Sequence, residues 1–435
     1  MLHYLGDFPQ AIKKSARQVG AILVYKKGDE FIYLMKDKFK DFTYNEKVNK
    51  ALGGVKKRIC NIKAIYDESY TVGLKRGTPI ELYFTCGNGN CKKAILYINM
   101  VKEDSTSKQV DIEAVDYLTY WENNEDKPQS LAIARDTSLI DFEKTLFNSM
   151  GWKYLFSSGV ANPQLTLGYP RSNKLSQTLE EMAIANNATI DFGFHTEYGL
   201  RLSFKLTATL SITSNDKGVN PPQGEFEVQV KPFKFGSVVD TLGSENISSF
   251  RVEEDQDKYK DVRVNLFFPS HGDVKSLGTI NVTIPGSITN YDIGSIDFGS
   301  PMIPQYCHFK GSSSITVDSY KLGPTSCSFR VSNSLPNAQS LVIEFFGFEV
   351  SESTLKDTDT DSDIKQITNM YIQSPTAYDT RIYKGANCTI EDFGNPLIEV
   401  GDTIVFEDKT ILVTEQNLKY NGGLKGTTKG VVLNG

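Results

Sequence analysis

The sequence predicts a mainly β fold with a smaller α+β domain, and three observations lead to this prediction. Short runs of alternating apolar and polar residues recur along most of the chain, which is typical of strands with one buried face. Glycine, asparagine and aspartate stand between these runs, as they do in tight turns. Apolar residues at helical spacing are confined to roughly residues 139–186. At 435 residues the chain is too long for one hydrophobic core, so we expect about three or four domains.

Composition and charge narrow the class of protein. Hydrophobic residues make up 39% of the chain and charged residues 23%, which indicates a globular protein. The net charge is −6, with acids and bases interspersed, and this pattern argues against specific nucleic-acid binding. The N-terminus has no basic region followed by an apolar run, so no signal peptide is expected. No apolar run is long enough to cross a bilayer, so no membrane segment is expected.

Residues 10–121 are predicted to form the first β domain. The runs 21–25 and 31–35 flank a glycine-containing turn and should form a hairpin. A second hairpin is expected from the runs 80–85 and 94–101, and the run 110–118 alternates strictly as far as Ala114. Several strands with turns between them favour a barrel or a small sandwich.

The cysteines do not form a recognisable framework. Six of them are scattered along the chain, too sparsely for a disulfide scaffold. Cys86 and Cys91 are the only close pair, and they could be half of a metal site. The four residues between them, Gly-Asn-Gly-Asn, are typical of a turn, and no second close pair follows. A hairpin tip is therefore the favoured interpretation.

Residues 122–206 are predicted to form the α+β domain. One helix is expected over 139–150, with Ser138 as its N-cap and Gly151 just after its end. A second helix is expected over 175–186. The runs 190–195 and 200–204 then predict a hairpin.

The remainder of the chain is predicted to contain two more β domains. Residues 207–268 and 364–435 would form the second barrel-like domain, with a short helix as one interpretation of 364–378. Residues 269–350 are rich in Gly, Ser and Thr, alternate in several runs, and predict an inserted β-sandwich-like domain. Residues 351–363 are an acidic loop. The seven-residue Asp/Thr/Ser run at its end lacks the Gly and Glu of an EF-hand and is favoured to be solvated.

The sequence contains little that points to catalysis. Its four histidines stand in no metal-binding spacing, and no nucleophile elbow or phosphate-binding loop is present. Glu180, Glu181 and Asp191 could be a carboxylate set for sugar hydrolysis, but acids are common on a helix surface. We therefore predict no catalytic, cofactor-binding or metal-binding residues, no cofactor and no enzymatic activity. No binding residue can be singled out.

The order of segments resembles the baseplate hub, or tail-associated N-terminal module, of tailed bacteriophages and related contractile tail particles. The residues that carry this resemblance lie in five stretches: 14–18, 62–67, 110–117, 175–183 followed by 199–202, and 395–426. The last stretch, with Asn395-Pro-Leu-Ile-Glu-Val-Gly-Asp402 and the Gly-rich turn before Gly426, is the most specific match. The block 269–350 matches least.

The resemblance implies a structural virion protein. Such hubs are homotrimers in which each chain supplies two similar β-barrel (tube) domains, so that three chains form a pseudo-sixfold ring. That ring closes the tail tube or distal tail protein ring and joins it to spike, needle or tape measure proteins, and the genome passes through its lumen. The implied location is the virion tail tip, after synthesis in the host cytoplasm. Hubs with a long extension carry a peptidase or lysozyme part there, and none is expected in this chain.

Two alternatives remain open at this point. The Gly/Ser/Thr-rich block 269–350 would also suit a surface glycan-binding or adhesin module. An uncatalogued cell-wall hydrolase using Glu180, Glu181 or Asp191 is the third hypothesis. The resemblance does not distinguish contractile tails from flexible tails or bacteriocins.

Overall fold

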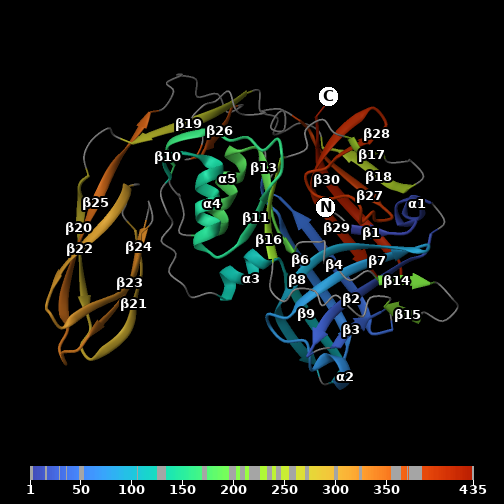
Figure 1. Cartoon of the computed structure of the whole chain (residues 1–435), viewed down its shortest axis with the longest axis horizontal. Coiled ribbons are helices and arrows are strands. Elements are labelled where there is room, and N and C mark those ends of the chain that lie inside the picture. Colours follow the sequence, from blue (N-terminus) through green and yellow to red (C-terminus); the bar gives the residue numbers. More distant parts are fainter. Residues whose placement is uncertain are drawn as a thin grey trace.

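The computed structural model consists mainly of β-strands, with its two longest described helices packed together in one part (Figure 1). The structure describes residues 3–14, 17–28, 30–35, 37–48, 53–104, 106–124, 134–168, 174–194, 202–205, 211–214, 226–232, 238–241, 246–253, 261–269, 274–297, 302–322, 326–353, 364–369, 371 and 385–433.

The first β unit is the part of the long sheet formed by the N-terminal strands. Its strands are β2 Val19–Lys27, β3 Glu30–Leu34, β4 Phe39–Lys47, β6 Lys57–Ile65, β7 Pro79–Cys86, β8 Gly89–Asp104 and β9 Gln109–Val115. They are hydrogen-bonded in the order β4-β6-β9-β8-β7-β2-β3. Alternate side chains enter one apolar core, as the period-2 pattern predicts. Three short elements border the unit: β1 His3–Leu5, α1 Phe8–Ile12 and α2 Glu68–Thr71.

The second β unit is the part of the same sheet formed by C-terminal strands. Its strands are β17 Val238–Thr241, β18 Ile247–Val252, β27 Asn387–Asp392, β28 Thr403–Phe406, β29 Lys409–Tyr420 and β30 Leu424–Val432. They pair in the order β18-β27-β30-β29-β28-β17 around a second apolar cluster. A two-residue turn at Glu407 and Asp408 joins β28 to β29.

The two β units repeat one strand order. β4-β6-β9-β8-β7-β2 in the first corresponds to β18-β27-β30-β29-β28-β17 in the second. In both, a two-residue turn joins the fifth and fourth strands of this order. The fourth strand has one bulge against the third, between Ile98 and Met100 in β8 and between Val413 and Glu415 in β29. The units differ at their ends, because β2 joins β7 antiparallel whereas β17 joins β28 parallel.

The α+β unit packs its helices against a four-stranded sheet. The helices are α3 Tyr117–Asn124, α4 Leu139–Ser149 and α5 Leu175–Ala185, and the sheet runs β11 Lys153–Phe156, β16 Phe226–Pro232, β13 Ala188–Phe194, β5 Gly54–Val55. β10 Ala134–Ser138 and β12 Gln164–Gly168 form a separate pair. Both predicted helices are confirmed. The Ser138 hydroxyl accepts a hydrogen bond from the Asp141 backbone N–H, and Gly151 follows α4 with a φ of 70°.

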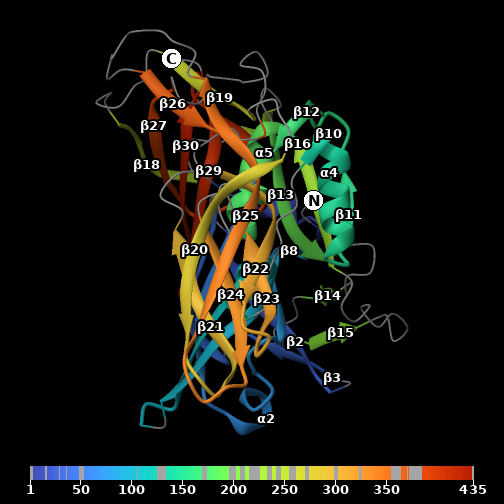
Figure 2. The ribbon, with the colours of Figure 1, turned by 90° about the vertical axis from the view of Figure 1, so that its left-hand side faces the viewer.

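The inserted unit faces the viewer in Figure 2 as two sheets around one apolar cluster. The larger sheet contains β20 Lys275–Ile284, β22 Met302–Gly311 and β25 Gln339–Ser353, and continues into β19 Asp261–Pro269 and β26 Ile364–Thr368. The smaller sheet contains β21 Ile288–Asp297, β24 Ser326–Asn333 and β23 Ile315–Leu322. Alternating runs thus form a sandwich-like pair of sheets, as expected.

Two expectations about local structure are wrong. Residues 190–195 and 200–204 do not pair with each other: β13 joins β16 and β5, and β14 Leu202–Lys205 joins β15 Ser211–Ser214. The first residues of 364–378 form β26, which pairs with β19, rather than a helix. In both cases a strand-like run found a partner distant in sequence, which periodicity cannot identify. The first three residues of the expected acidic loop 351–363 instead form the end of β25 and pair with β19, and residues 354–363 lie outside the described residues. The division into domains stays a prediction.

Candidate functional site

The most informative place in the molecule is the joint between the two β units. β29 pairs antiparallel with β4, from Glu415 opposite Lys47 to Tyr420 opposite Phe42. The rings of Phe42 and Tyr420 stack with centroids 5.5 Å apart and an interplanar angle of 15°. Leu418 and Tyr420 are completely buried in the core of the first β unit. The last hairpin of the chain therefore fills the core of its first unit.

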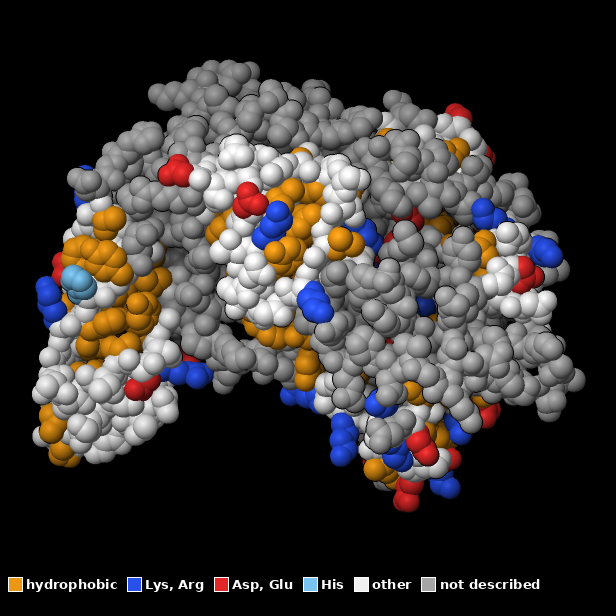
Figure 3. All heavy atoms as spheres, viewed as in Figure 1, with side chains coloured by type: hydrophobic (Ala, Val, Ile, Leu, Met, Phe, Trp, Pro, Cys, Tyr) orange, Lys and Arg blue, Asp and Glu red, His pale blue; other side chains and the backbone are white. Residues whose placement is uncertain are grey.

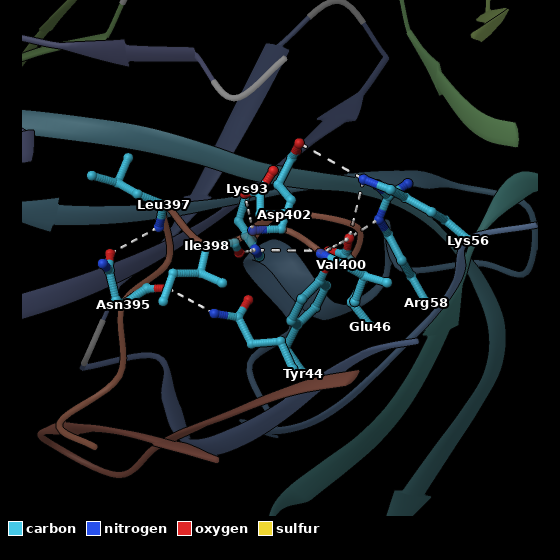
Figure 4. Close-up of polar contacts among 12 residues, drawn as sticks. Tyr44, Glu46, Lys56, Arg58, Lys93, Asn395, Leu397, Ile398, Val400 and Asp402 are labelled. Atoms are coloured by element: carbon cyan, nitrogen blue, oxygen red, sulfur yellow. Dashed lines mark hydrogen bonds and ion pairs between the residues drawn. The ribbon is translucent and has the colours of Figure 1, made fainter. Parts of the chain in front are cut away.

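A buried cluster of charges lies beside this joint, where the α+β unit also meets it (Figure 4). It contains three cationic and three anionic side chains: Lys56, Arg58, Lys93, Glu46, Asp191 and Glu399. Their formal charges sum to zero. We call this set the joint cluster.

Glu46 is the shared anion of the joint cluster. Its carboxylate lies 3.5 Å from Lys56 Nζ, 3.6 Å from Arg58 Nε and 3.7 Å from Lys93 Nζ. The Tyr44 hydroxyl donates to it over 2.7 Å. Tyr44 and Glu46 are two residues apart on β4, so both point to the same inner side of the strand.

Lys93 reaches the joint cluster because of a bulge. The ladder between β7 and β8 skips one residue there, since Leu82 faces Ala94 while Tyr83 faces Lys92. A bulge re-aims the side chain of the extra residue. The completely buried ammonium of Lys93 donates to the Ile398 carbonyl over 2.6 Å.

Arg58 and Asp191 connect the first β unit to the α+β unit. Two guanidinium nitrogens of Arg58 donate to the two carboxylate oxygens of Asp191, over 2.5 and 2.9 Å. This bidentate geometry fixes orientation as well as distance. Lys56 Nζ lies 3.8 Å from the same carboxylate and 3.7 Å from Glu399. Three separate parts of the chain are thus held by one charge network.

The turn over residues 394–402 packs against the joint cluster through the Ile398 carbonyl and the Glu399 carboxylate. It is stabilised by its own side chains, because Asn395 Oδ1 accepts from the Leu397 N–H over 3.0 Å and Asp402 Oδ2 from the Glu399 N–H over 2.9 Å. Gln416 donates to the Asn395 carbonyl over 2.7 Å. This is the stretch that carries the most specific resemblance, and its residues serve to shape a turn rather than to present a reactive group.

The electrostatics keep the acids of the joint cluster ionised. Burial by itself would raise the pKa of Asp191, but Arg58 and Lys56 outweigh it and hold that pKa well below its usual value. Burial opposes ionisation of Glu399 in the same way, and Lys56 lowers the pKa of Glu399 to about 2. The pKa of Glu46 is also lowered, because three cations outweigh its burial. None of these carboxylates can act as a proton donor near neutral pH.

The candidate hydrolase residues are not assembled as an acid–base pair. Asp191 is engaged by Arg58, and Glu180 lies 3.9 Å from Lys57 with little of its side chain exposed. The backbone carbonyl of Glu181 accepts from Asn369 over 2.7 Å. The structure therefore places the carboxylates of Glu180 and Asp191 in ion pairs.

The other candidate sites are also accounted for. Cys86 and Cys91 are buried free thiols at either side of the predicted hairpin tip, which is confirmed. Within the described ranges, no group of three or more His, Cys, Asp or Glu side chains is arranged to hold a metal ion. In the same part of the chain, no helix combines the length and the apolar character that crossing a membrane requires.

A cavity of about 500 Å³ is lined in part by Lys47 and Glu415, which face each other at the end of the β4–β29 ladder. Three lysines and three glutamates are among the residues that line it: Lys47, Lys57, Lys429, Glu180, Glu253 and Glu415. Its balanced charge offers no selectivity for an anion or a cation.

Sequence reasoning missed the joint cluster. Lys56 and Arg58 stand in the run Lys56-Lys57-Arg58, which looks like an exposed basic stretch. Lys93 follows Lys92 in a strand and carries no signal of burial. A usable signal was Glu46 on the apolar face of its strand, because a buried carboxylate requires cations nearby.

Comparison with known proteins gives structural likeness only. No protein-family model and no curated protein matches the sequence. Solved structures do match. The chain is similar in structure to phage tail proteins.

Three of the solved structures illustrate this similarity. The 43 kDa tail protein of prophage MuSo2 from Shewanella oneidensis is 9% identical, with 95% of this chain and 98% of that chain covered and a TM-score of 0.44. A tail protein from Neisseria meningitidis MC58 is 9% identical, with 95% and 96% covered and a TM-score of 0.46. The E. coli c3393 protein, a type VI secretion component described as similar to the T4 bacteriophage tail proteins gp27 and gp5, is 8% identical, with 91% and 73% covered and a TM-score of 0.34. Likenesses at this level do not by themselves assign a function to the chain.

Proposed function

We propose that the chain is a structural virion protein, the baseplate or tail-tip hub of a tailed phage or a related contractile particle. The observation that carries the proposal is the internal repeat of two β units joined edge to edge by β4 and β29. Three such chains in a ring would present six similar β units. A ring of that kind matches a sixfold tube on one side and a threefold tip on the other.

In this proposal the chain is a homotrimer, and its partners are other structural proteins of the tail. The ring closes the tail tube or the distal tail protein ring, and it holds the spike, needle or tape measure protein at the tip. The genome passes through the lumen without being gripped, which agrees with a net charge of −6 and interspersed acids and bases. No catalytic role is assigned to any residue.

The joint cluster supports this role because a ring under load needs a fixed angle between its β units. Buried ion pairs add little net stability, but removal of one partner is strongly destabilising, so they favour a single geometry. The joint cluster connects both β units and the α+β unit through Glu46, Arg58, Asp191 and Glu399. We infer that it sets the angle at which the two β units meet.

The mass of the purified native protein in solution tests the proposal. Light scattering should give three times the 48.5 kDa of one chain, and negative-stain images should show rings with six lobes. Purified tail particles should contain the chain, which an antibody or mass spectrometry would detect. Its absence from such particles would overturn the proposal, whatever its mass in solution.

A second candidate function is surface glycan binding by the inserted unit. Tyr306 and Phe346 stack with centroids 5.2 Å apart on the outer side of β22 and β25, and His308 lies 4.8 Å from Phe346. Tyr306 is 41% exposed, and Figure 3 shows hydrophobic side chains beside a histidine on this unit. Aromatic surfaces of this kind suit sugar rings. A glycan array probed with the full chain and with Tyr306→Ala would decide, and the absence of any signal would remove this candidate.

A further inference from the structure

Two stretches of the long sheet have a described ladder partner on one edge only, and the first of these is the far part of β8. β7 pairs with β8 as far as Tyr97, and Ile98 still bonds to Thr78. From Met100 to Asp104 the described ladder partner of β8 is β9, on one edge only. Met100 is 52% exposed, and the residues after Val101 are exposed too. An edge of this kind presents backbone groups that can accept another strand.

The second such stretch is β18. It pairs with β27 along one edge and is the terminal strand of the described sheet. Arg251 and Glu253 are exposed there. Figure 1 shows β18 near the upper end of the two joined β units and the β8–β9 hairpin near their lower end. The two edges therefore lie at opposite ends of the repeat.

The joint within the chain shows how these two edges can fit together. β29, the counterpart of β8, pairs with β28 as far as Leu412 and then leaves it. Its next residues, Glu415–Tyr420, pair with β4. In the repeated strand order, β4 corresponds to β18. The counterpart of the β29–β4 pairing is thus a pairing between β8 and β18, which one chain does not make with itself.

The repeat also determines the register of that pairing. Val413 and Ile98 are the residues directly before the bulge in β29 and in β8, so they correspond to each other. By the same alignment, Leu418 of β29 corresponds to Glu103 of β8. The residues directly opposite one another can be traced from β8 to β4 in the first unit and from β29 to β18 in the second. This comparison places Tyr44 of β4 in correspondence with Val252 of β18. The two routes run Ile98↔Ala114↔Cys60↔Tyr44 and Val413↔Gly430↔Cys388↔Val252. Both routes pass through a buried cysteine at the same step, which supports the alignment.

We propose that β8 of one copy pairs antiparallel with β18 of a second copy, with Glu103 opposite Val252. This inference rests on the ring of the proposed function and names the strands that would close it. The register places Lys102 opposite Glu253 and Asp104 opposite Arg251. Both pairs join opposite charges on one face of the ladder, and like charges directly opposite would instead oppose pairing. The contact is heterologous, so it propagates from copy to copy, and it closes as a ring when the rotation between neighbouring copies returns to the first copy.

Disulfide cross-linking of the full chain tests the pairing directly. Directly opposite residues of an antiparallel pair are close enough for a disulfide. Lys102→Cys combined with Glu253→Cys should give covalent dimers and trimers under mild oxidation. The six native cysteines are buried and give a low background. The matched control combines Lys102→Cys with Lys310→Cys, an exposed position on the inserted unit, and should give no ladder of covalent species.

The outcomes separate this inference from the proposed function. An oligomer in light scattering that yields no more cross-link than the control overturns the β8–β18 pairing and leaves the hub proposal standing. A chain that stays monomeric at every concentration overturns the pairing together with the ring. Cross-linked trimers support both.

Charge reversal provides a second readout that does not depend on cysteine chemistry. Lys102→Glu and Glu253→Lys should each weaken assembly on the order of fivefold per contact. The double variant should restore assembly, because it re-creates an opposite pair. Weak assembly of both single variants without recovery in the double variant would overturn the register.

Discussion

Replacing Glu143 by glutamine should remove a large pH dependence from the stability of the α+β unit. Glu143 lies on α4 and is completely buried, and the Asn186 amide donates to both of its carboxyl oxygens over 3.0 Å. Burial raises the pKa of Glu143 to about 8, and the hydrogen bonds from Asn186 offset only part of that effect. Near neutral pH this carboxyl is therefore mostly protonated in the folded protein.

The sign and size of the effect follow from linkage. The pKa of an exposed glutamate is 4.5, so Glu143 binds its proton more tightly in the folded state. Its contribution to stability is complete below about pH 4.5 and is lost as the pH rises through about 8. A difference of about 3.5 pH units corresponds to roughly 5 kcal/mol in the free energy of unfolding. About 2 kcal/mol of this should be lost between pH 6 and pH 8.

Urea unfolding of the wild type and Glu143→Gln at pH 5, 6, 8 and 9 measures the effect. Glutamine has almost the same shape and cannot ionise, so the difference between the two proteins cancels other titrating groups. The wild type should lose stability relative to the variant as the pH rises, and the difference should level off above pH 8. Parallel pH profiles within about 1 kcal/mol would falsify the reasoning.

Three further predictions concern the joint. Arg58→Met leaves the buried carboxylate of Asp191 without its bidentate partner and should lower the free energy of unfolding by about 3–5 kcal/mol in denaturant titrations; wild-type stability would contradict this. Leu418→Ala should cost about 2–5 kcal/mol and loosen the first β unit in hydrogen exchange, although the residue belongs to the C-terminal hairpin; protection lost only around β29 would count against it. Gly426→Ala places a Cβ 2.1 Å from a carboxylate oxygen and should lower the melting temperature by an amount equivalent to about 1–3 kcal/mol. Gly423→Ala, where nothing lies within 4 Å, is the matched control and should leave it nearly unchanged, and equal shifts for both would refute the steric argument.

Local patterns were enough to predict most elements of the fold. Alternation identified the strands around the 87–88 turn, and Ser138 marked the start of α4. These signals are short-range, because a turn or a cap depends on a few neighbouring residues. They failed where a strand took a partner far away, as β13 and β26 did.

The joint cluster could not be predicted, and its residues show why. Lys93 is buried because one bulge in β8 turns it inward, and Glu46 is tolerated on an apolar face only because three cations converge on it. Neither the bulge nor the convergence is visible in a local window of sequence. The repeat of the two β units is similarly hidden, since it lies in strand order and bulge position and not in a shared residue pattern.

The sequence by itself determined the mainly β class, the helical segment, the lack of a recognised catalytic motif and the resemblance to tail hubs. These follow from periodicity, composition and the order of segments, which the chain carries regardless of how it folds. Only the tertiary structure decided that β29 joins β4, that the joint is held by buried charges, and that β18 and the far part of β8 each have a described ladder partner on one edge only. The physical reason is that strand pairing and ion pairing are long-range. Which strands and charges pair depends on how the whole chain is arranged in space, and not on the residues next to them in the sequence.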